Sequence, residues 1–165
     1  MSIVLDIVRT YRAPRDTIAR RIGTDVREDR ALAVLMGACV LIFIAQWPRL
    51  AREAWLAPDI GFDARLAGAL FAWLFLMPLV FYGLSLILSG LLHLFRRPAN
   101  GYSIRMALFW GLLAATPLFL LTGLTAGFVG PGPALNLVGA LAFGALVVFW
   151  VTGISLVARR RTETG

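Results

Sequence analysis

The sequence predicts an all-α polytopic membrane protein, a bundle of about four transmembrane helices preceded by an N-terminal amphipathic interfacial region. Two observations predict this class. Hydrophobic residues make up 59% of the 165-residue chain and charged residues 15%, with a mean hydropathy of +0.80, which is unusual for a soluble globular domain. The apolar residues also gather in four runs, each close to or above the roughly 20 residues that a helix needs to cross a bilayer.

Residues 1–30 form the N-terminal segment, in which we expect two short amphipathic helices separated at Pro14. Apolar residues of the first helix recur with helical spacing at Ile3, Val4, Ile7, Val8 and Tyr11, and its polar side carries Asp6, Arg9 and Thr10. Ile18 and Ile22 share one face of the second helix. We expect both helices to lie on the inner leaflet, where lipid phosphates meet Arg9, Arg12, Arg15, Arg20 and Arg21. The alternative is a solvated charged flank. The early acids and Pro14 interrupt any signal-like apolar core, so we expect no cleaved secretory signal.

The transmembrane domain is expected over residues 31–158, followed by a cytoplasmic tail at 159–165. Its spans are predicted at about 31–47, 66–95, 106–129 and 135–157. Asp25 and Glu28 have the spacing of a capping box before the first span. Trp47 and Trp55 bracket a short expected interfacial helix on the outer side. The segment 130–136 carries no charge and two prolines, which predicts a tight outer turn between the last two spans.

The arginines predict the orientation. All sixteen basic residues are arginine, and the net charge is +7. With the N-terminus inside, thirteen arginines lie on the inner side, and only Arg49, Arg52 and Arg65 lie outside. This positive-inside bias predicts a multi-pass membrane protein with both termini in the cytoplasm. The expected partners are anionic lipids of the inner leaflet, and a larger membrane complex or self-association. Acids interspersed among the N-terminal arginines argue against nucleic acid as a partner.

Two kinds of feature inside the spans predict helix geometry. Pro78 and Pro117 lie near the middle of their spans and predict kinks, and Thr116 or a neighbouring helix is expected to serve the carbonyl that Pro117 frees. Small residues four apart predict close helix packing at Ser85 and Ser89, at Gly123 and Gly127, and at Ala140 and Gly144. Such pairs of small residues leave shallow notches on a helix surface, which allow close contacts within the bundle and with a partner protein equally well.

The chain offers no motif for catalysis, and we expect no enzyme activity, no cofactor and no metal site. His93, the only histidine, is expected to be an interfacial side chain rather than a haem or metal ligand. Asp59 and Asp63 are expected to belong to a polar loop with a helix cap, although cation binding or acid–base chemistry is the alternative. Cys39 is the only cysteine, which excludes an intramolecular disulfide.

Four segments carry a family resemblance: YRAPRDTIARRI, REDRALAVLMGACVLIFIAQWPRLARE, RMALFWGLLAATPLFLLTG and GFVGPGPALN. Together they resemble the bacterial branch of the Yip family, the Ypt/Rab-interacting integral membrane proteins. The resemblance covers nearly the whole chain and rests on diffuse patterns rather than on a catalytic signature. It implies a multi-span protein of the bacterial inner membrane that helps to shape membranes. Four spans depart from the five usual in that family, and Rab binding is not carried over to a bacterium.

Two functions of different classes follow as expectations. The first is a non-enzymatic inner-membrane protein of Yip type that acts as a scaffold, accessory subunit or membrane-organising protein. The alternative is a small oligomeric transporter or channel that uses the proline-kinked helices at Pro78 and Pro117, as broken helices do in transporters.

Overall fold

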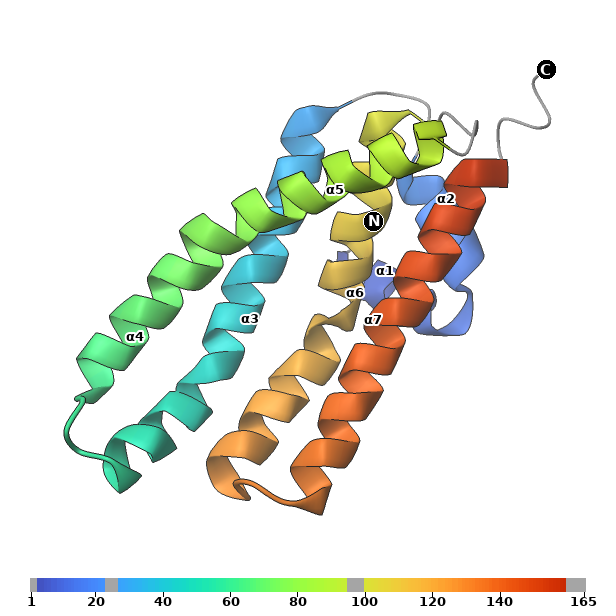
Figure 1. The fold of residues 1–165 in the computed structure, drawn as a ribbon. Helices are drawn as coiled ribbons and strands as arrows, with labels where there is room; N and C mark the ends of the chain where they lie inside the picture. The colour runs from blue at the N-terminus through green and yellow to red at the C-terminus, as the bar shows by residue number, and fades with distance from the viewer. Residues whose placement is uncertain (1–2, 23–26, 95–99, 160–165) are drawn as a thin grey trace.

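The computed structural model describes residues 3–22, 27–94 and 100–159. Within these ranges every regular element is a helix, and four helices are long and apolar enough to cross a membrane (Figure 1). These spans are Glu28–Leu56, Phe62–Leu94, Gly101–Phe128 and Pro133–Ala158. The expected all-α, four-span membrane fold is confirmed. Most ends extend beyond the predicted ranges, because a helix satisfies its own backbone groups and can carry polar residues once it leaves the hydrocarbon.

The centre of the bundle is α6 (Gly101–Phe128), which packs against α3 (Glu28–Leu56) and α7 (Pro133–Arg159). Its first half is buried almost all round, and Phe109 and Trp110 are fully enclosed. The turn to α7 is tight, as expected: Gly130 adopts a left-handed φ of 87° and Pro133 opens α7. A proline is favoured at that first helical position because its missing N–H needs no partner there.

α3 and α6 approach most closely at the small residues that the sequence pattern singled out. A Cβ atom at Gly123 would overlap the carbonyl oxygen of Ala45, and one at Gly127 would overlap Pro48. Close backbone approach of this kind replaces the hydrophobic driving force that is missing between helices in lipid. The residues between Trp47 and Trp55 are helical, as expected, but they belong to α3, which continues through Pro48 to Leu56, and do not form a short interfacial helix of their own. Gly127 provides the space in which the Pro48 ring packs.

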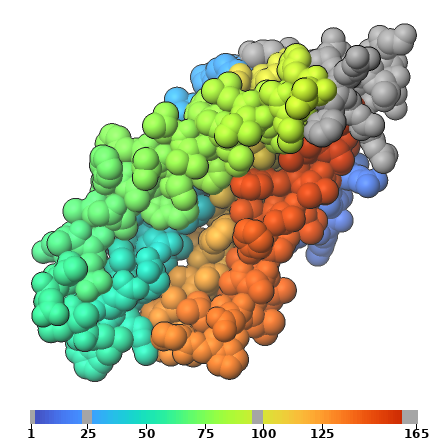
Figure 2. Space-filling view, viewed as in Figure 1, coloured from blue at the N-terminus to red at the C-terminus, as the bar shows by residue number. Residues whose placement is uncertain are grey.

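The second span consists of α4 (Phe62–Phe71), the π-helical segment η1 (Ala72–Leu76) and α5 (Met77–Leu94). It lies on the outside of the bundle, where Figure 2 shows it as an uninterrupted band. Pro78 stands just after the π turn, in which the Met77 N–H bonds to the Ala72 carbonyl. A widened helical turn therefore directly precedes Pro78, and such π turns are one of the known irregularities at which helices bend.

The N-terminal hairpin consists of α1 (Ile3–Arg12) and α2 (Pro14–Ile22). It packs against α6 and α7 near the end of the bundle at which α3 begins (Figure 1). We call this end the hairpin end, and the opposite end, with residues 57–61 and 129–132, the loop end. Two short helices broken at Pro14 were predicted correctly. The apolar face of α2, expected to lie on the inner leaflet, is instead directed inward, because Ile18 and Ile22 are buried in the protein core.

Candidate functional site

The polar side of α1 faces the protein. Asp6 is buried and forms an ion pair with Arg21 of α2. Thr10 is fully buried, donates to the Asp6 carbonyl at 2.7 Å and accepts from the Trp110 indole N–H at 3.2 Å. The Arg21 guanidinium carbon lies 4.4 Å from the centre of the Trp110 ring, in a cation–π contact. These contacts attach the N-terminal hairpin to α6, because Thr10 and the Trp110 indole would be costly to leave without their partners in apolar surroundings.

Tyr11 extends the attachment deeper into the bundle. Its hydroxyl donates to the Ala114 carbonyl at 2.9 Å, and its ring meets Phe149 of α7 edge-on. Burial raises the pKa of the Tyr11 phenol above its ordinary value of 10.0. At 1.5 Å per residue, Ala114 lies about 13 Å further along α6 than Arg105, which pairs with Glu28 at the hairpin end. The hairpin therefore reaches into the half of the bundle at that end.

The apolar side of α1 faces away from the protein. Ile3, Val4, Leu5 and Val8 are all more than half exposed. In water this arrangement would be unfavourable, but in a bilayer lipid chains cover such a face. Of the predicted apolar face of α1, Ile3, Val4 and Val8 are thus directed outward, as expected for a helix at the acyl boundary, whereas Ile7 packs against the core and Tyr11 contacts α6 and α7.

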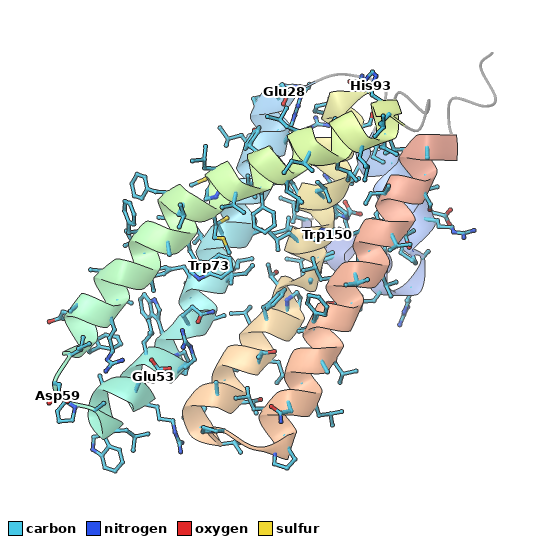
Figure 3. The ribbon with its side chains drawn as sticks, viewed as in Figure 1. Glu28, Glu53, Asp59, Trp73, His93 and Trp150 are labelled. Atoms are coloured by element: carbon cyan, nitrogen blue, oxygen red, sulfur yellow. The ribbon has the colours of Figure 1, made fainter. Side chains whose placement is uncertain are left out.

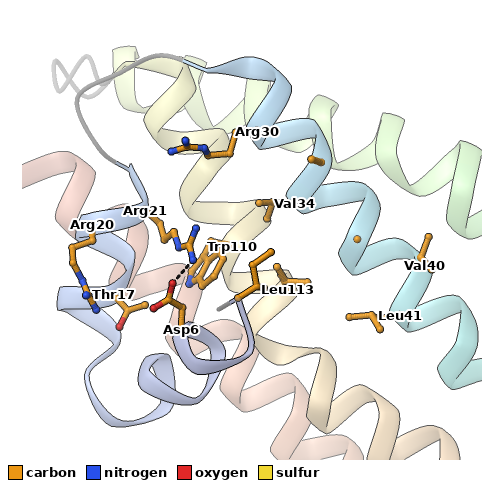
Figure 4. Close-up of a pocket in the computed structure, with 13 residues that line it drawn as sticks. Asp6, Thr17, Arg20, Arg21, Arg30, Val34, Val40, Leu41, Trp110 and Leu113 are labelled. Atoms are coloured by element: carbon orange, nitrogen blue, oxygen red, sulfur yellow. Dashed lines mark hydrogen bonds and ion pairs between the residues drawn. The ribbon is translucent and has the colours of Figure 1, made fainter. Parts of the chain in front are cut away.

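A cavity of about 880 Å³ opens between the N-terminal hairpin and α3, with α6 as its floor (Figure 4). We call it the hairpin groove. Its lining residues come from four helices: Ile3 and Asp6 of α1, Thr17, Arg20 and Arg21 of α2, Arg30, Ala33, Val34, Gly37, Val40 and Leu41 of α3, and Trp110 and Leu113 of α6. Its volume lies within the roughly 300–1,000 Å³ typical of small-molecule sites.

One side of the hairpin groove is basic. Arg21 is neutralised by Asp6, whereas no ion pair involves Arg20 or Arg30 among the described residues. Two positive charges therefore remain in excess on the lining. Thr17 also lines this part, and its buried hydroxyl has no hydrogen-bond partner among the residues that the structure describes. Buried hydroxyls normally have a partner, so the Thr17 hydroxyl is a hydrogen-bonding group left unused beside the groove.

The other side of the groove is apolar. Figure 4 shows Arg20 and Arg21 toward one side and Val40 and Leu41 toward the other. Along α3, Ala33, Val34 and Gly37 precede them on the same helix face. Nothing lies within 4 Å of the position that a Cβ of Gly37 would occupy, so this glycine widens the wall. The groove thus joins a basic mouth to an apolar channel, which is the chemistry needed to bind an amphipathic anion.

The five arginines expected at lipid phosphates have different environments. Arg12, Arg15 and Arg20 are exposed, as that role requires, and half of the Arg9 side chain is exposed beside Asp6, 3.8 Å away. Arg21 is wrong for that role, because it pairs with Asp6 and stacks on Trp110. The expected capping residue Asp25 lies outside the described residues. Its partner Glu28 instead begins α3 and pairs with Arg105.

The expected kink and packing residues lie apart from the groove, and none of them belongs to its lining. Thr116 donates to the Leu113 carbonyl at 2.8 Å, which is the carbonyl that Pro117 frees, so this expectation is confirmed. Ser85 is buried and Ser89 partly buried, and both hydroxyls bond within α5, to the Tyr82 and Ser85 carbonyls. Ala140 and Gly144 face outward and make no notch inside the chain. α7 instead approaches α6 at Gly153, against Ala107.

The polar residues at the ends of the spans are dispersed. Figure 3 places His93 and Glu28 at the hairpin end and Asp59 and Glu53 at the loop end. No three His, Cys, Asp or Glu side chains group as metal ligands within residues 3–22, 27–94 and 100–159. The cap of α4 is Gly61 rather than an aspartate. Arg65 holds the 57–61 segment by donating to the Ala57 and Ile60 carbonyls.

Sequence reasoning missed the groove residues Thr17, Arg30, Gly37 and Trp110. Thr17 lies three residues before Arg20, so it shares a helix face with that charge, and this was the available signal. From the sequence, Arg30 is interpreted only as a charged residue flanking the first span. Trp110 carried no signal, because its partners Thr10 and Arg21 lie about a hundred residues away along the chain.

Comparison of the chain with family models, with curated proteins and with solved structures finds no match in any of the three.

Proposed function

We propose that this chain is a non-enzymatic integral protein of the bacterial inner membrane that organises or shapes the bilayer, in the manner expected of the Yip type. One observation carries the proposal: the N-terminal hairpin is attached to one half of the bundle only. Trp110 and Ala114 hold it at the hairpin end, whereas the nearest neighbours of Gly123 and Gly127, further along α6, are Ala45 and Pro48 of α3.

The physical consequence is an asymmetric cross-section. In the half at the loop end the protein displaces lipid with four spans. In the other half it displaces lipid with the same spans and with two further helices, whose outer face carries Val4 and Val8. Insertion of apolar helices into one leaflet is sensitive to membrane curvature. A wedge of this shape favours membranes that are convex on the hairpin side.

The direction of the wedge follows from the arginine distribution. Among the described residues, nine arginines belong to the segments at the hairpin end and three to those at the loop end, which supports a cytoplasmic position of the hairpin end. The three at the loop end are bound locally: Arg49 and Arg65 pair with Glu53, and Arg52 donates to the Gly127 carbonyl. Both termini are then cytoplasmic, and convex curvature is favoured in the inner leaflet.

The proposal is tested by curvature sorting. The labelled protein is reconstituted in giant vesicles, and its density on narrow pulled tethers is compared with its density on the flat membrane. Molecules with the hairpin on the outer surface of the tether should be enriched there. Val4→Ser combined with Val8→Ser should lower the enrichment, whereas Leu56→Ser with Ile60→Ser, a matched exchange at the loop end, should not. Equal density on tether and flat membrane, or equal effects of the two pairs, would exclude the wedge.

The transporter alternative is less well supported by the structure. The Pro117 interruption is satisfied inside its helix by Thr116, and the π turn before Pro78 keeps a backbone hydrogen bond. Transporter sites instead expose such interrupted backbone to a central cavity. Solute flux through reconstituted vesicles that disappears in a folded Pro117→Ala variant would replace the present proposal with a transport function.

A further inference from the structure

We propose that the hairpin groove binds one phospholipid with an anionic headgroup, whose phosphate lies at Arg20, Arg30 and Thr17 and one of whose acyl chains follows α3 toward Leu41. This inference does not depend on the wedge, because a protein can bind a lipid with or without sensing curvature.

The basic mouth has the charge and the donors for a phosphate. Arg20 on α2 and Arg30 on α3 approach it from two helices, and neither has a carboxylate partner among the described residues. Guanidinium groups pair with phosphate oxygens in a bidentate geometry that lysine cannot provide. Thr17 lines the same mouth, and its buried hydroxyl, which has no partner among the described residues, is a neutral donor that a small rotation could turn to the phosphate. Asp6 does not repel an anion strongly, because Arg21 neutralises it.

The apolar wall has the length of one leaflet. Arg30 and Leu41 are eleven residues apart on α3, which corresponds to about 16 Å along the helix. Half of a bilayer hydrocarbon core is about 15 Å. A lipid whose phosphate lies at Arg30 would therefore place its acyl chain beside Val34, Gly37 and Leu41 over the full depth of its leaflet.

A phospholipid fits both sides of the groove better than a soluble anion does. Inorganic phosphate would satisfy the arginines and leave the α3 wall without a partner. A neutral or zwitterionic lipid would cover the wall and leave two positive charges without compensation. An anionic phospholipid meets both requirements, and the bilayer that surrounds α3 supplies it without an aqueous step.

The test uses the full chain in zwitterionic detergent and native mass spectrometry, with phosphatidylglycerol and phosphatidylcholine as probes. One phosphatidylglycerol should be retained in preference to phosphatidylcholine. Arg20→Gln combined with Arg30→Gln should weaken retention about 30-fold, from the usual contribution of two basic residues near an anionic surface. Arg12→Gln with Arg15→Gln is the matched control, because it removes the same charge from exposed positions outside the groove.

A second pair of variants tests the acyl channel. Gly37→Leu should fill the wall and reduce retention, while Gly144→Leu, an exchange at an equally open glycine in α7, should leave it unchanged. Helical circular dichroism checks that each variant is folded. Equal retention of the two lipids, equal loss in both arginine pairs, no effect of Gly37→Leu in a folded protein, or displacement of the lipid by millimolar inorganic phosphate would each overturn the inference.

Discussion

The attachment of the N-terminal hairpin depends on the Asp6 carboxylate, so replacing Asp6 tests directly what holds the hairpin on the bundle. Asp6→Ala leaves Arg21 without its carboxylate in a largely buried position over Trp110. Removing one partner of a buried ion pair costs about 3–5 kcal/mol. The Arg21 side chain keeps 23% of its surface exposed and keeps its ring contact, so we expect a smaller cost, about 2–3 kcal/mol.

Trypsin measures this cost, because it cleaves after the hairpin arginines only when the helices open. The cleavage rate follows the open population when opening is fast, so about 2–3 kcal/mol corresponds to roughly 30- to 150-fold faster cleavage. The substitution changes no arginine and therefore keeps every trypsin site. The assay is run on the purified full chain in detergent micelles, with the first cleavage products followed by mass spectrometry.

Asp16→Ala is the matched control for this prediction. Asp16 lies on α2, is exposed, and forms no ion pair within the described residues. Its removal costs at most about 1 kcal/mol through the helix dipole, which corresponds to roughly fivefold faster cleavage. If Asp6→Ala accelerated cleavage no more than Asp16→Ala does, the buried pair would not hold the hairpin.

Three other predictions concern topology, packing and pH. Reporter fusions at the C-terminus should behave as cytoplasmic, and a periplasmic signal there would contradict the proposed orientation. Gly123→Ala should lower the free energy of unfolding by about 1–3 kcal/mol, because the new Cβ atom overlaps the Ala45 carbonyl. Gly144→Ala, at an open position, should leave the free energy of unfolding unchanged. Equal unfolding temperatures of the two variants would refute the close approach. The raised pKa of Tyr11 means that the phenol ionises more easily in the detached hairpin than in the attached one. Trypsin cleavage should therefore accelerate as pH rises above about 10, and Tyr11→Phe should lose that component; an unchanged pH profile would contradict it.

The sequence by itself determined the elements whose formation depends on residues that are neighbours along the chain. Four apolar runs predict four spans because the hydrocarbon core leaves a backbone no partner but its own helix. Pro14 separates two short helices, and Thr116 serves the carbonyl freed by the next residue, because those atoms are neighbours along the chain. The close approach at Gly123 and Gly127 was also predictable as a small-residue pattern, although not its partner.

Only the tertiary structure decided how these elements are used. A helical pattern shows that α1 has a polar and an apolar side, but it does not say which side meets the protein. That choice depends on Trp110, which offers Thr10 and Arg21 a partner a hundred residues away. α3 continues through Pro48 because Gly127 of another helix makes room for the ring. The hairpin groove exists only where α1, α2, α3 and α6 meet, because each helix contributes part of the wall and no single helix encloses a cavity.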